Sequence, residues 1–290
     1  NKPNLSDWEK IAHIANLAEK TVKIGIVGKY FSTGEFVLSD SYISVIESVK
    51  HAAYAKNRKP VIEWLNSESF ENSKNCRSLK NFDGIIVPGG FGARGVEGKI
   101  QVIKFCRENK IPYLGLCYGM QLAVIEFARH VAGLKDANTT EVNSTPPHPV
   151  IDILPEQKEL MKEKNYGGTM RLGSYPAILK EGTIAHSAYS ISYKLKANQL
   201  ISERHRHRYE VNPEYIEKLE KAGLVFSGVS PDRKLMEIAE LPKSKHPFFL
   251  GSQFHPEFTS RPLSPNPLFL EFVKNAINNH GRMKLGEKQN

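Results

Sequence analysis

The first half of the chain alternates short apolar runs with segments of helical spacing, and this alternation restricts the fold more than any other feature. The apolar runs lie at 23–28, 61–66, 84–90 and 113–117, and the helical segments lie at 40–56, 97–109 and 118–132. Such alternation predicts a parallel sheet covered by helices on both faces. Ligands of these sheets bind at the carboxyl ends of the strands, where "PGG" and "LC" fall in this sequence.

The second half of the chain has a different pattern. Residues 138–175 are rich in Thr, Pro, Asn and Gly, and 173–211 reads as strands and turns without an obvious crossover helix. We therefore expect an antiparallel flap or subsheet in this region. Regular order then returns, with helices at 213–222 and after Asn266–Pro267 and with strands at 224–229, 235–240 and 248–254.

The two ends of the chain are expected to lie outside the main domain. Residues 1–20 have the pattern of one amphipathic helix, with Trp8, Ile14 and Leu17 on the same side. We interpret this helix as the end of an interdomain linker, because a new apolar run begins directly after it. The main domain is then expected at 21–280, and the tail 281–290 is expected to be disordered.

Composition and charge limit the class of protein. The chain has 290 residues and a net charge of +9, and it contains no apolar run of membrane-spanning length. Its three cysteines are too few for a disulfide framework, so we expect free thiols and a cytoplasmic location. The densest basic cluster is "SERHRHRYE" at 202–210. A nucleic-acid surface there is kept as an alternative, although the other basic residues are scattered and nucleic acid is not the expected partner.

Cys117 lies where an apolar strand pattern changes into a helical one. Gly115 and Gly119 flank it two residues away on each side, as in the tight elbow that presents the nucleophile of many hydrolases. A helix N-terminus favours a thiolate over a thiol. Cys117 is therefore a candidate nucleophile, and a small buried structural cysteine is the alternative.

A candidate base closes another apolar run, "PFFLGSQFHPEF" at 247–258. His255 follows the strand, and Glu257 lies two residues further on, where its carboxylate can hold the imidazole in one tautomer. The alternative is a surface His–Glu pair without a catalytic role. Together with the cysteine elbow, the pair predicts a nucleophile, a base and an orienting acid.

Acyl chemistry also requires hydrogen-bond donors for the developing oxyanion. The loop "VPGGFG" places Gly89 and Gly90 at the end of a strand, where their N–H groups can approach a substrate. The N–H of Tyr118, directly after the cysteine, is the second candidate donor. A phosphate cradle is the alternative for this loop, but the Lys-Ser/Thr ending of a P-loop is missing.

These motifs, in this order and spacing, resemble the class I, triad-type glutamine amidotransferases. Further stretches narrow the resemblance to the glutaminase domains of CTP synthases over about residues 20–275: "GKY", "VPGGFGARGVEGK", "YLGLCYGMQ", "GGTMRLG", "ERHRHRYEVN" and "QFHPEF". The resemblance implies an α/β fold, a flavodoxin-like three-layer α/β/α glutaminase with a mostly parallel central sheet and a small antiparallel subsheet. It also implies hydrolysis of glutamine to glutamate and ammonia.

The resemblance assigns roles to individual residues. Cys117 would attack the side-chain amide of glutamine, His255 would transfer the proton, and Glu257 would orient His255. Gly89 and the N–H of Tyr118 would form the oxyanion hole. The remaining glutamine contacts would come from Gly89, Gln121, Glu141, Arg208 and Tyr209, with Glu141 on the ammonium and Arg208 and the Tyr209 backbone on the carboxylate.

The resemblance also implies partners and effectors. Glutamine hydrolysis would need no cofactor and no metal, whereas the ATP-dependent amination of UTP to CTP, which uses ATP and Mg²⁺, belongs to a synthetase half that we expect to be absent from this chain. GTP would act as an allosteric activator, through a region that matches Phe91, Arg94, Glu97 and Arg171. Homotetramers and filaments are implied for the complete enzyme. A non-catalytic module for glutamine binding or assembly is the alternative.

Overall fold

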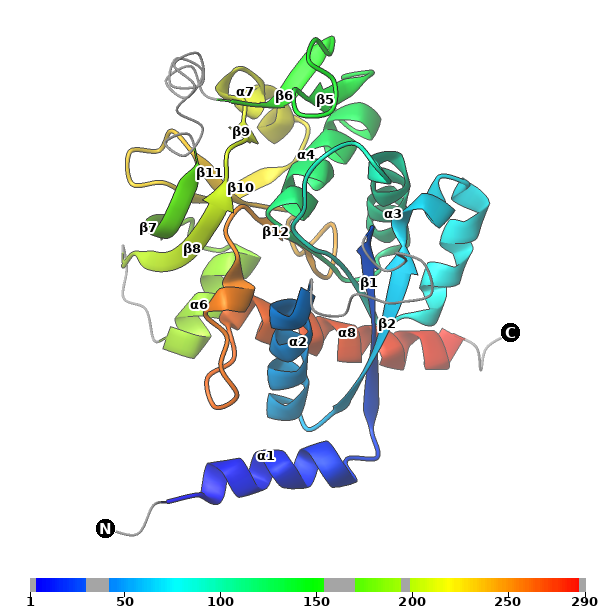
Figure 1. Cartoon of the computed structure of the whole chain (residues 1–290), viewed down its shortest axis with the longest axis vertical. Helices are drawn as coiled ribbons and strands as arrows, with labels where there is room; N and C mark the ends of the chain where they lie inside the picture. The colour runs from blue at the N-terminus through cyan, green and yellow to red at the C-terminus, as the bar shows by residue number, and fades with distance from the viewer. Residues whose placement is uncertain (1–3, 30–41, 154–169, 194–198, 287–290) are drawn as a thin grey trace.

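The computed structural model describes residues 4–29, 42–153, 170–193 and 199–286 (Figure 1). Nine strands of this part of the chain form one large sheet, in the order β2-β1-β3-β4-β12-β11-β10-β7-β8. The strands are β1 (Thr21–Gly28), β2 (Lys59–Asn66), β3 (Gly84–Val87), β4 (Tyr113–Leu116), β7 (Arg171–Leu179), β8 (Ile201–His207), β10 (Val225–Val229), β11 (Met236–Glu240) and β12 (Phe249–Ser252).

The large sheet has a parallel half and an antiparallel half. β2, β1, β3, β4 and β12 are parallel to their neighbours, as the alternating pattern of the first half predicts. From β12 onward the pairings with β11, β10, β7 and β8 are all antiparallel. β4 and β12 are therefore neighbours at the centre of the sheet, which brings the residues after both strands to the same edge.

Helices cover both faces of the sheet and make the three-layer fold that the sequence predicts. Two separate groups of buried apolar side chains fill the space between the sheet and the helices. One contains residues of α3 (Val96–Asn109), α4 (Tyr118–His130) and α7 (Pro213–Lys221), and the other contains residues of α2 (Ile43–Ala55), α6 (Ile184–Tyr193) and α8 (Pro267–Gly286). Short 3-10 helices lie at Ser67–Phe70, Ser73–Asn81 and Pro256–Phe258.

A second, three-stranded sheet lies at one end of the molecule (Figure 1). It consists of β5 (Ala137–Thr139), β6 (His148–Asp152) and β9 (Glu210–Val211). β5 and β6 are parallel, and β6 and β9 are antiparallel, so this small sheet is mixed. The antiparallel pairing expected for the second half of the chain is mainly in the large sheet instead. Residues 154–169 of the expected flap lie outside the described residues.

The helix α6 was not expected from the sequence, which we interpreted as strands and turns over 173–211. Its first turn is held by a residue from a distant strand, because the Glu240 carboxylate accepts hydrogen bonds from the N–H groups of Ile184 and Ala185 at 2.6 and 3.0 Å. A local cap is present as well, because the Thr183 hydroxyl oxygen accepts from the His186 N–H at 3.2 Å, and our interpretation of the sequence missed it. Packing of Ala188 and Tyr189 in the core then stabilises the helix.

The helix α1 (Ser6–Leu17) stands apart from the sheet at the far end of β1 (Figure 1). Of its predicted apolar side, Ile14 is buried, whereas Trp8 and Leu17 are 49% and 65% exposed. At the other end of the chain, α8 continues to Gly286, beyond the boundary expected at 280. Within the described ranges, no helix is long and apolar enough to cross a membrane.

Candidate active site

Cys117 occupies a sharp turn between β4 and α4. Its backbone has φ 51° and ψ −100°, a conformation that a residue with a side chain rarely adopts. The turn is held by the Cys117 N–H, which donates to the Ser252 carbonyl at 2.6 Å. Such strain persists only where the surrounding structure enforces it, and it is typical of functional sites.

Two glycines make this turn possible by close approach of the backbone. A Cβ atom on Gly119 would lie 2.1 Å from the Val87 carbonyl oxygen, and a Cβ atom on Gly115 would lie 2.6 Å from the Tyr113 hydroxyl. Neither distance is compatible with a side chain. The structure therefore explains the Gly-x-Cys-x-Gly spacing by steric exclusion on both sides of the cysteine.

His255 and Glu257 lie directly after β12, beside the cysteine turn. The His255 Nδ1 and a Glu257 carboxylate oxygen are 2.7 Å apart, and both side chains are buried. Because a carboxylate accepts, Nδ1 carries the proton, and Nε2 is the free nitrogen of the neutral ring. Among the described residues, Nε2 has no hydrogen-bond partner with suitable geometry.

The charge state of His255 depends on its two neighbours. Burial lowers the pKa of His255, but the charges of Cys117 and Glu257 and the hydrogen bond to Glu257 outweigh burial, and the pKa is raised well above its ordinary value. A raised pKa means that the imidazolium is favoured while a thiolate and a carboxylate lie beside it. The arrangement can therefore hold a thiolate–imidazolium pair.

Gly89 lies at the point where the histidine and the cysteine meet. A Cβ atom on Gly89 would be 2.9 Å from Cε1 of His255 and 3.7 Å from Cβ of Cys117. Only a residue without a side chain leaves room for a substrate between them. Gly89 therefore borders the reacting atoms, with its backbone at the edge of the same space.

These residues share one cavity of about 800 Å³, at the carboxyl ends of the central strands. Its lining includes most of the residues that the sequence nominated: Gly89, Phe91, Cys117, Gln121, Glu141, Arg208, Tyr209, His255 and Glu257. Tyr118 lies next to the cavity at the start of α4, and its hydroxyl donates to the Gly92 carbonyl at 2.9 Å. Gly90, the other glycine of this loop, also lines the cavity.

The polar side chains proposed to hold glutamine are themselves held in place. One Glu141 oxygen accepts from the Gly92 N–H at 2.7 Å, and burial raises the pKa of Glu141 although Gly92, Lys29 and Arg208 lower it. The Gln121 amide nitrogen donates to the Tyr209 carbonyl at 3.0 Å. Glu141 and Gln121 therefore line the same cavity with their side chains already held by hydrogen bonds.

The four residues nominated for the GTP response do not form one group. Phe91 is 68% exposed and receives a cation–π contact from Lys29 at 5.0 Å, and Arg94 donates to the Lys29 carbonyl. Glu97, in contrast, pairs with Arg129 at 2.8 Å. Arg171 lies in a different environment altogether, as described below.

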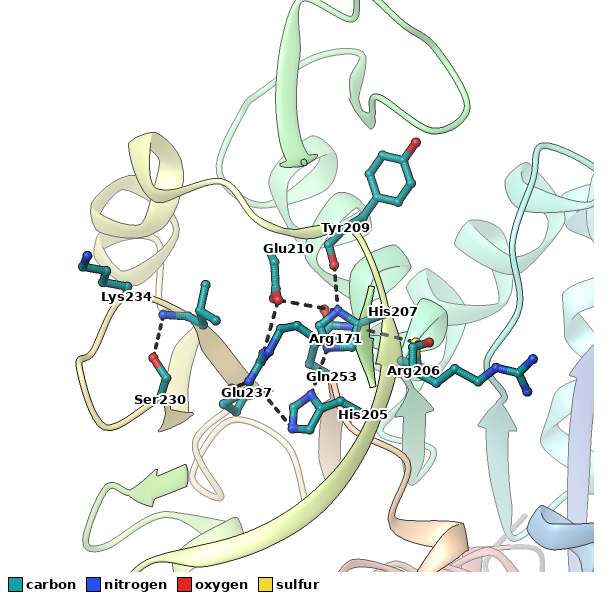
Figure 2. Close-up of polar contacts among 12 residues, drawn as sticks. Arg171, His205, Arg206, His207, Tyr209, Glu210, Ser230, Lys234, Glu237 and Gln253 are labelled. Atoms are coloured by element: carbon teal, nitrogen blue, oxygen red, sulfur yellow. Dashed lines mark hydrogen bonds and ion pairs between the residues drawn. The ribbon is translucent and has the colours of Figure 1, made fainter. Parts of the chain in front are cut away.

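Strand β8 separates its basic cluster into two faces. Glu203, His205 and His207 are buried, whereas Arg204 and Arg206 are exposed. Figure 2 shows Arg206 pointing away from the two histidines. The alternation of His and Arg in "RHRHR" was the signal for this division, and our interpretation as a basic cluster missed it. The basic surface that β8 offers is therefore limited to Arg204 and Arg206, because both histidines of the cluster are buried.

Arg171, at the start of β7, pairs with the buried carboxylates of Glu210 and Glu237 (Figure 2). Its guanidinium lies 3.2 Å from Glu210 and 2.9 Å from Glu237. A second Glu237 oxygen lies 3.6 Å from Nε2 of His205, and Nδ1 of His205 lies 2.9 Å from Nε2 of His207. We call these five residues the Arg171 cluster. Sequence reasoning identified only Arg171 among them, in another role.

Both histidines of the Arg171 cluster are neutral. Burial and the charge of Arg171 lower the pKa of His205 to about 3, and burial with His205 and Arg171 lowers the pKa of His207 well below its ordinary value. Burial also raises the pKa of Glu210 to about 8, against the opposing effect of Arg171. Across the described ranges, the structure contains no group of three or more metal-ligating side chains placed to hold a metal ion.

Comparison with known proteins agrees with this geometry. Residues 37–275 match the family Glutamine amidotransferase class-I. The CTP synthase of Carboxydothermus hydrogenoformans is 55% identical over 272 residues, which are 94% of this chain and 48% of that protein. The CTP synthase of Pyrococcus furiosus is 50% identical over 276 residues, 95% of this chain and 48% of that protein. The chain thus spans about half the length of the curated relatives it matches.

A solved structure covers nearly the whole domain. The glutaminase domain of Trypanosoma brucei CTPS, with bound acivicin, is 39% identical and has a TM-score of 0.79, covering 89% of this chain and 94% of that chain. The match includes both the sequence and the arrangement of the sheet and helices. The chain therefore belongs to the class I glutamine amidotransferases and is a glutaminase domain of the CTP synthase type.

Proposed function

We propose that the chain hydrolyses L-glutamine to glutamate and ammonia at Cys117, with His255 as the base and Glu257 as the acid that orients it. One observation carries the proposal: a Cβ atom on Gly89 would lie 2.9 Å from Cε1 of His255 and 3.7 Å from Cβ of Cys117, and all three residues line one cavity. A nucleophile, a base and a backbone that can donate to an oxyanion meet there.

The chemistry follows from these positions. The thiolate of Cys117 attacks the carboxamide carbon, and the negative charge on the oxygen is met by the N–H groups near Gly89 and of Tyr118. As the C–N bond breaks, His255 gives its Nε2 proton to the leaving ammonia, and a thioester remains. A water then loses a proton to His255 and attacks the thioester, which releases glutamate and restores the thiolate.

The pocket supports recognition of both ends of the amino acid. Glu141 would bind the ammonium, and Arg208 with the Tyr209 backbone would bind the carboxylate, because all three line the cavity that contains Cys117. Gln121 would complete the pocket. An arginine grips a carboxylate with directed, charge-assisted hydrogen bonds.

The name CTP synthase, which the relatives carry, supports a proposal for the use of the ammonia. We propose that it serves the amination of UTP to CTP by a synthetase region, which would use ATP and Mg²⁺, and that glutamine hydrolysis itself needs neither a cofactor nor a metal. Homotetramers and filaments are proposed for the complete enzyme. The three free, buried cysteines are consistent with a reducing compartment, and we propose the cytoplasm.

GTP is proposed as the allosteric activator. Phe91 and Arg94 are the better candidates for its contact, because both adjoin Lys29 beside the cavity and Phe91 is exposed. Arg171 and Glu97 would act indirectly, since each is engaged in ion pairs elsewhere. Arg171 in particular is only partly exposed, with its guanidinium against Glu210 and Glu237.

The test is glutamate release from L-glutamine by this chain, with and without GTP and with and without a synthetase region prepared separately. Release that disappears in Cys117→Ala supports the proposal, and stimulation by GTP supports the activator. If no combination gives release and a glutamine-mimicking electrophile does not label Cys117, the non-catalytic binding or assembly module becomes the better explanation.

A further inference from the structure

The sulfur of Cys117 has two polar neighbours besides His255. The Gln253 side-chain nitrogen lies 3.7 Å from Sγ, and the Arg206 carbonyl oxygen lies 4.0 Å from it. The amide N–H can only donate, and the carbonyl can only accept. The carbonyl therefore suits the S–H form of Cys117, whereas the amide suits the thiolate.

The orientation of the Gln253 amide is determined by its second neighbour. The Gln121 side-chain nitrogen donates to the Tyr209 carbonyl at 3.0 Å and to the Gln253 side-chain oxygen at 3.3 Å. Because the Tyr209 carbonyl can only accept, the Gln121 atom that contacts it is the NH₂ nitrogen, and the same nitrogen requires an acceptor from Gln253. Gln253 therefore turns its oxygen toward Gln121 and its NH₂ group toward the sulfur.

The backbone of Gln253 is held by hydrogen bonds, and its side chain is buried. The Gln253 N–H donates to the Glu237 carbonyl at 2.8 Å, and the preceding carbonyl, that of Ser252, accepts from the Cys117 N–H at 2.6 Å. The Gln253 side chain is fully buried, so water does not compete for its hydrogen bonds. Gln253 and Arg206 are both drawn in Figure 2.

We infer that Gln253 is a further catalytic residue, whose side-chain N–H stabilises the thiolate of Cys117. When Sγ loses its proton to Nε2 of His255, the contact with the Arg206 carbonyl loses its hydrogen and the contact with Gln253 becomes a charge-assisted hydrogen bond. Gln253 keeps both of its protons throughout. The inference rests on the proposed function for its catalytic meaning, but the hydrogen bond itself can be measured without turnover.

The inference predicts how fast Cys117 reacts with iodoacetamide as the pH changes. We would compare the unmodified chain with Gln253→Met, which removes the donor at similar length, and with Gln253→Glu, which places an acceptor beside the sulfur. Ser252→Ala is the matched control, because the Ser252 hydroxyl is buried on the same strand and donates to the Phe254 carbonyl instead. Mass spectrometry would locate the modified cysteine.

Loss of one hydrogen bond to a charged group should slow alkylation near neutral pH about tenfold in Gln253→Met. The midpoint of the profile should move to higher pH, the effect should be larger in Gln253→Glu, and Ser252→Ala should behave as the unmodified chain. Profiles of Gln253→Met and Gln253→Glu that coincide with that of Ser252→Ala would overturn the inference.

A measurement on the unmodified chain covers the case in which neither variant folds. The side-chain amide protons of Gln253 should shift downfield in NMR spectra over the pH range in which Cys117 becomes reactive, and an absent shift would overturn the inference. The proposed function is tested separately: if the alkylation profiles shift as expected and no glutamate is released, the hydrogen bond stands and the proposed reaction fails.

Discussion

The molecule has two buried histidine–glutamate pairs that differ in their charge, one lining the cavity and the other in the Arg171 cluster. In the first, His255 lies 2.7 Å from Glu257 and its pKa is raised well above the ordinary value, because Cys117 and Glu257 outweigh burial. In the second, His205 lies 3.6 Å from Glu237, and burial together with Arg171 lowers its pKa to about 3.

The difference comes from the third member of each group. Arg171 engages the Glu237 carboxylate at 2.9 Å, so that little of its negative charge is left for His205. Next to His255 the third member is Cys117, which adds negative charge when it ionises. A histidine–glutamate pair is therefore reactive or inert according to its neighbour, and not according to its own composition.

The largest expected effect comes from removing Cys117, the neighbour that raises the pKa of His255. Cys117→Ala should lower glutamine hydrolysis by about three orders of magnitude or more, because the covalent route is lost. The pKa of His255 should then fall toward its ordinary range, which NMR titration would show. Cys76→Ala and Cys106→Ala are the controls, since burial raises the pKa of both thiols and keeps them protonated. Equal losses in all three variants would contradict the assignment.

The next test removes members of the two pairs themselves. His255→Ala should lower kcat by several orders of magnitude, and Glu257→Ala should lower it less, because the imidazole remains while its tautomer is no longer held. Glu237→Gln, in the second pair, should have the smallest effect, since an amide oxygen can still accept from Arg171. The check is kcat for the three variants, and a loss in Glu237→Gln as large as in Glu257→Ala would remove the distinction between the pairs.

Removing Arg171 should cost stability. Arg171→Met leaves Glu210 and Glu237 buried without their cation, and breaking a buried ion pair in this way typically costs about 3 kcal/mol of unfolding free energy. Lys221→Met is the control, because the pair of Lys221 with Glu217 is exposed and its loss should have no measurable effect. Chemical denaturation of both variants measures the difference. Similar stability of Arg171→Met and the unmodified chain would show that the cluster relaxes around water.

Glu210 should make stability depend on pH in the opposite sense to an ordinary surface carboxylate. Its pKa rises from 4.5 to about 8 in the folded chain, so between these values the folded state binds more protons and rising pH favours unfolding. Glu210→Gln cannot titrate. The unfolding free energy of this variant should therefore gain on that of the unmodified chain by up to about 1.4 kcal/mol per pH unit across this range, and no further above it. A constant difference at every pH would show that Glu210 stays ionised.

The smallest expected effect concerns Arg208, which directly follows β8. Arg208→Lys should raise KM for glutamine about tenfold, because an ammonium cannot reproduce the two directed hydrogen bonds of a guanidinium to a carboxylate. Arg204→Ala, exposed on the same segment, should be milder. Glutamine kinetics and RNA binding at two salt concentrations check this. A normal KM in Arg208→Lys together with lost RNA affinity would favour the nucleic-acid interpretation of "RHRHR".

The fold could be predicted from the sequence wherever the signal was local. The strands at β1, β2, β3 and β4 and the helices between them follow from apolar periodicity, and each observed element begins or ends within a few residues of the expected position. Helix α6 was not predicted, because its local cap Thr183 was missed and because the Glu240 carboxylate that accepts from its first turn comes from another strand. The mixed pairing of the small sheet likewise depends on β9 meeting β6.

The sequence by itself determined the cysteine turn and the His255–Glu257 pair, because each lies within a few residues of chain. The glycines around Cys117 exclude side chains at fixed spacing, and the carboxylate lies two residues from its histidine. Only the tertiary structure decided that Arg171 lies between Glu210 and Glu237 and that Gln253 faces Cys117. These partners come from different strands, and the order of strands in the sheet, which no local pattern encodes, brings their side chains within hydrogen-bonding distance.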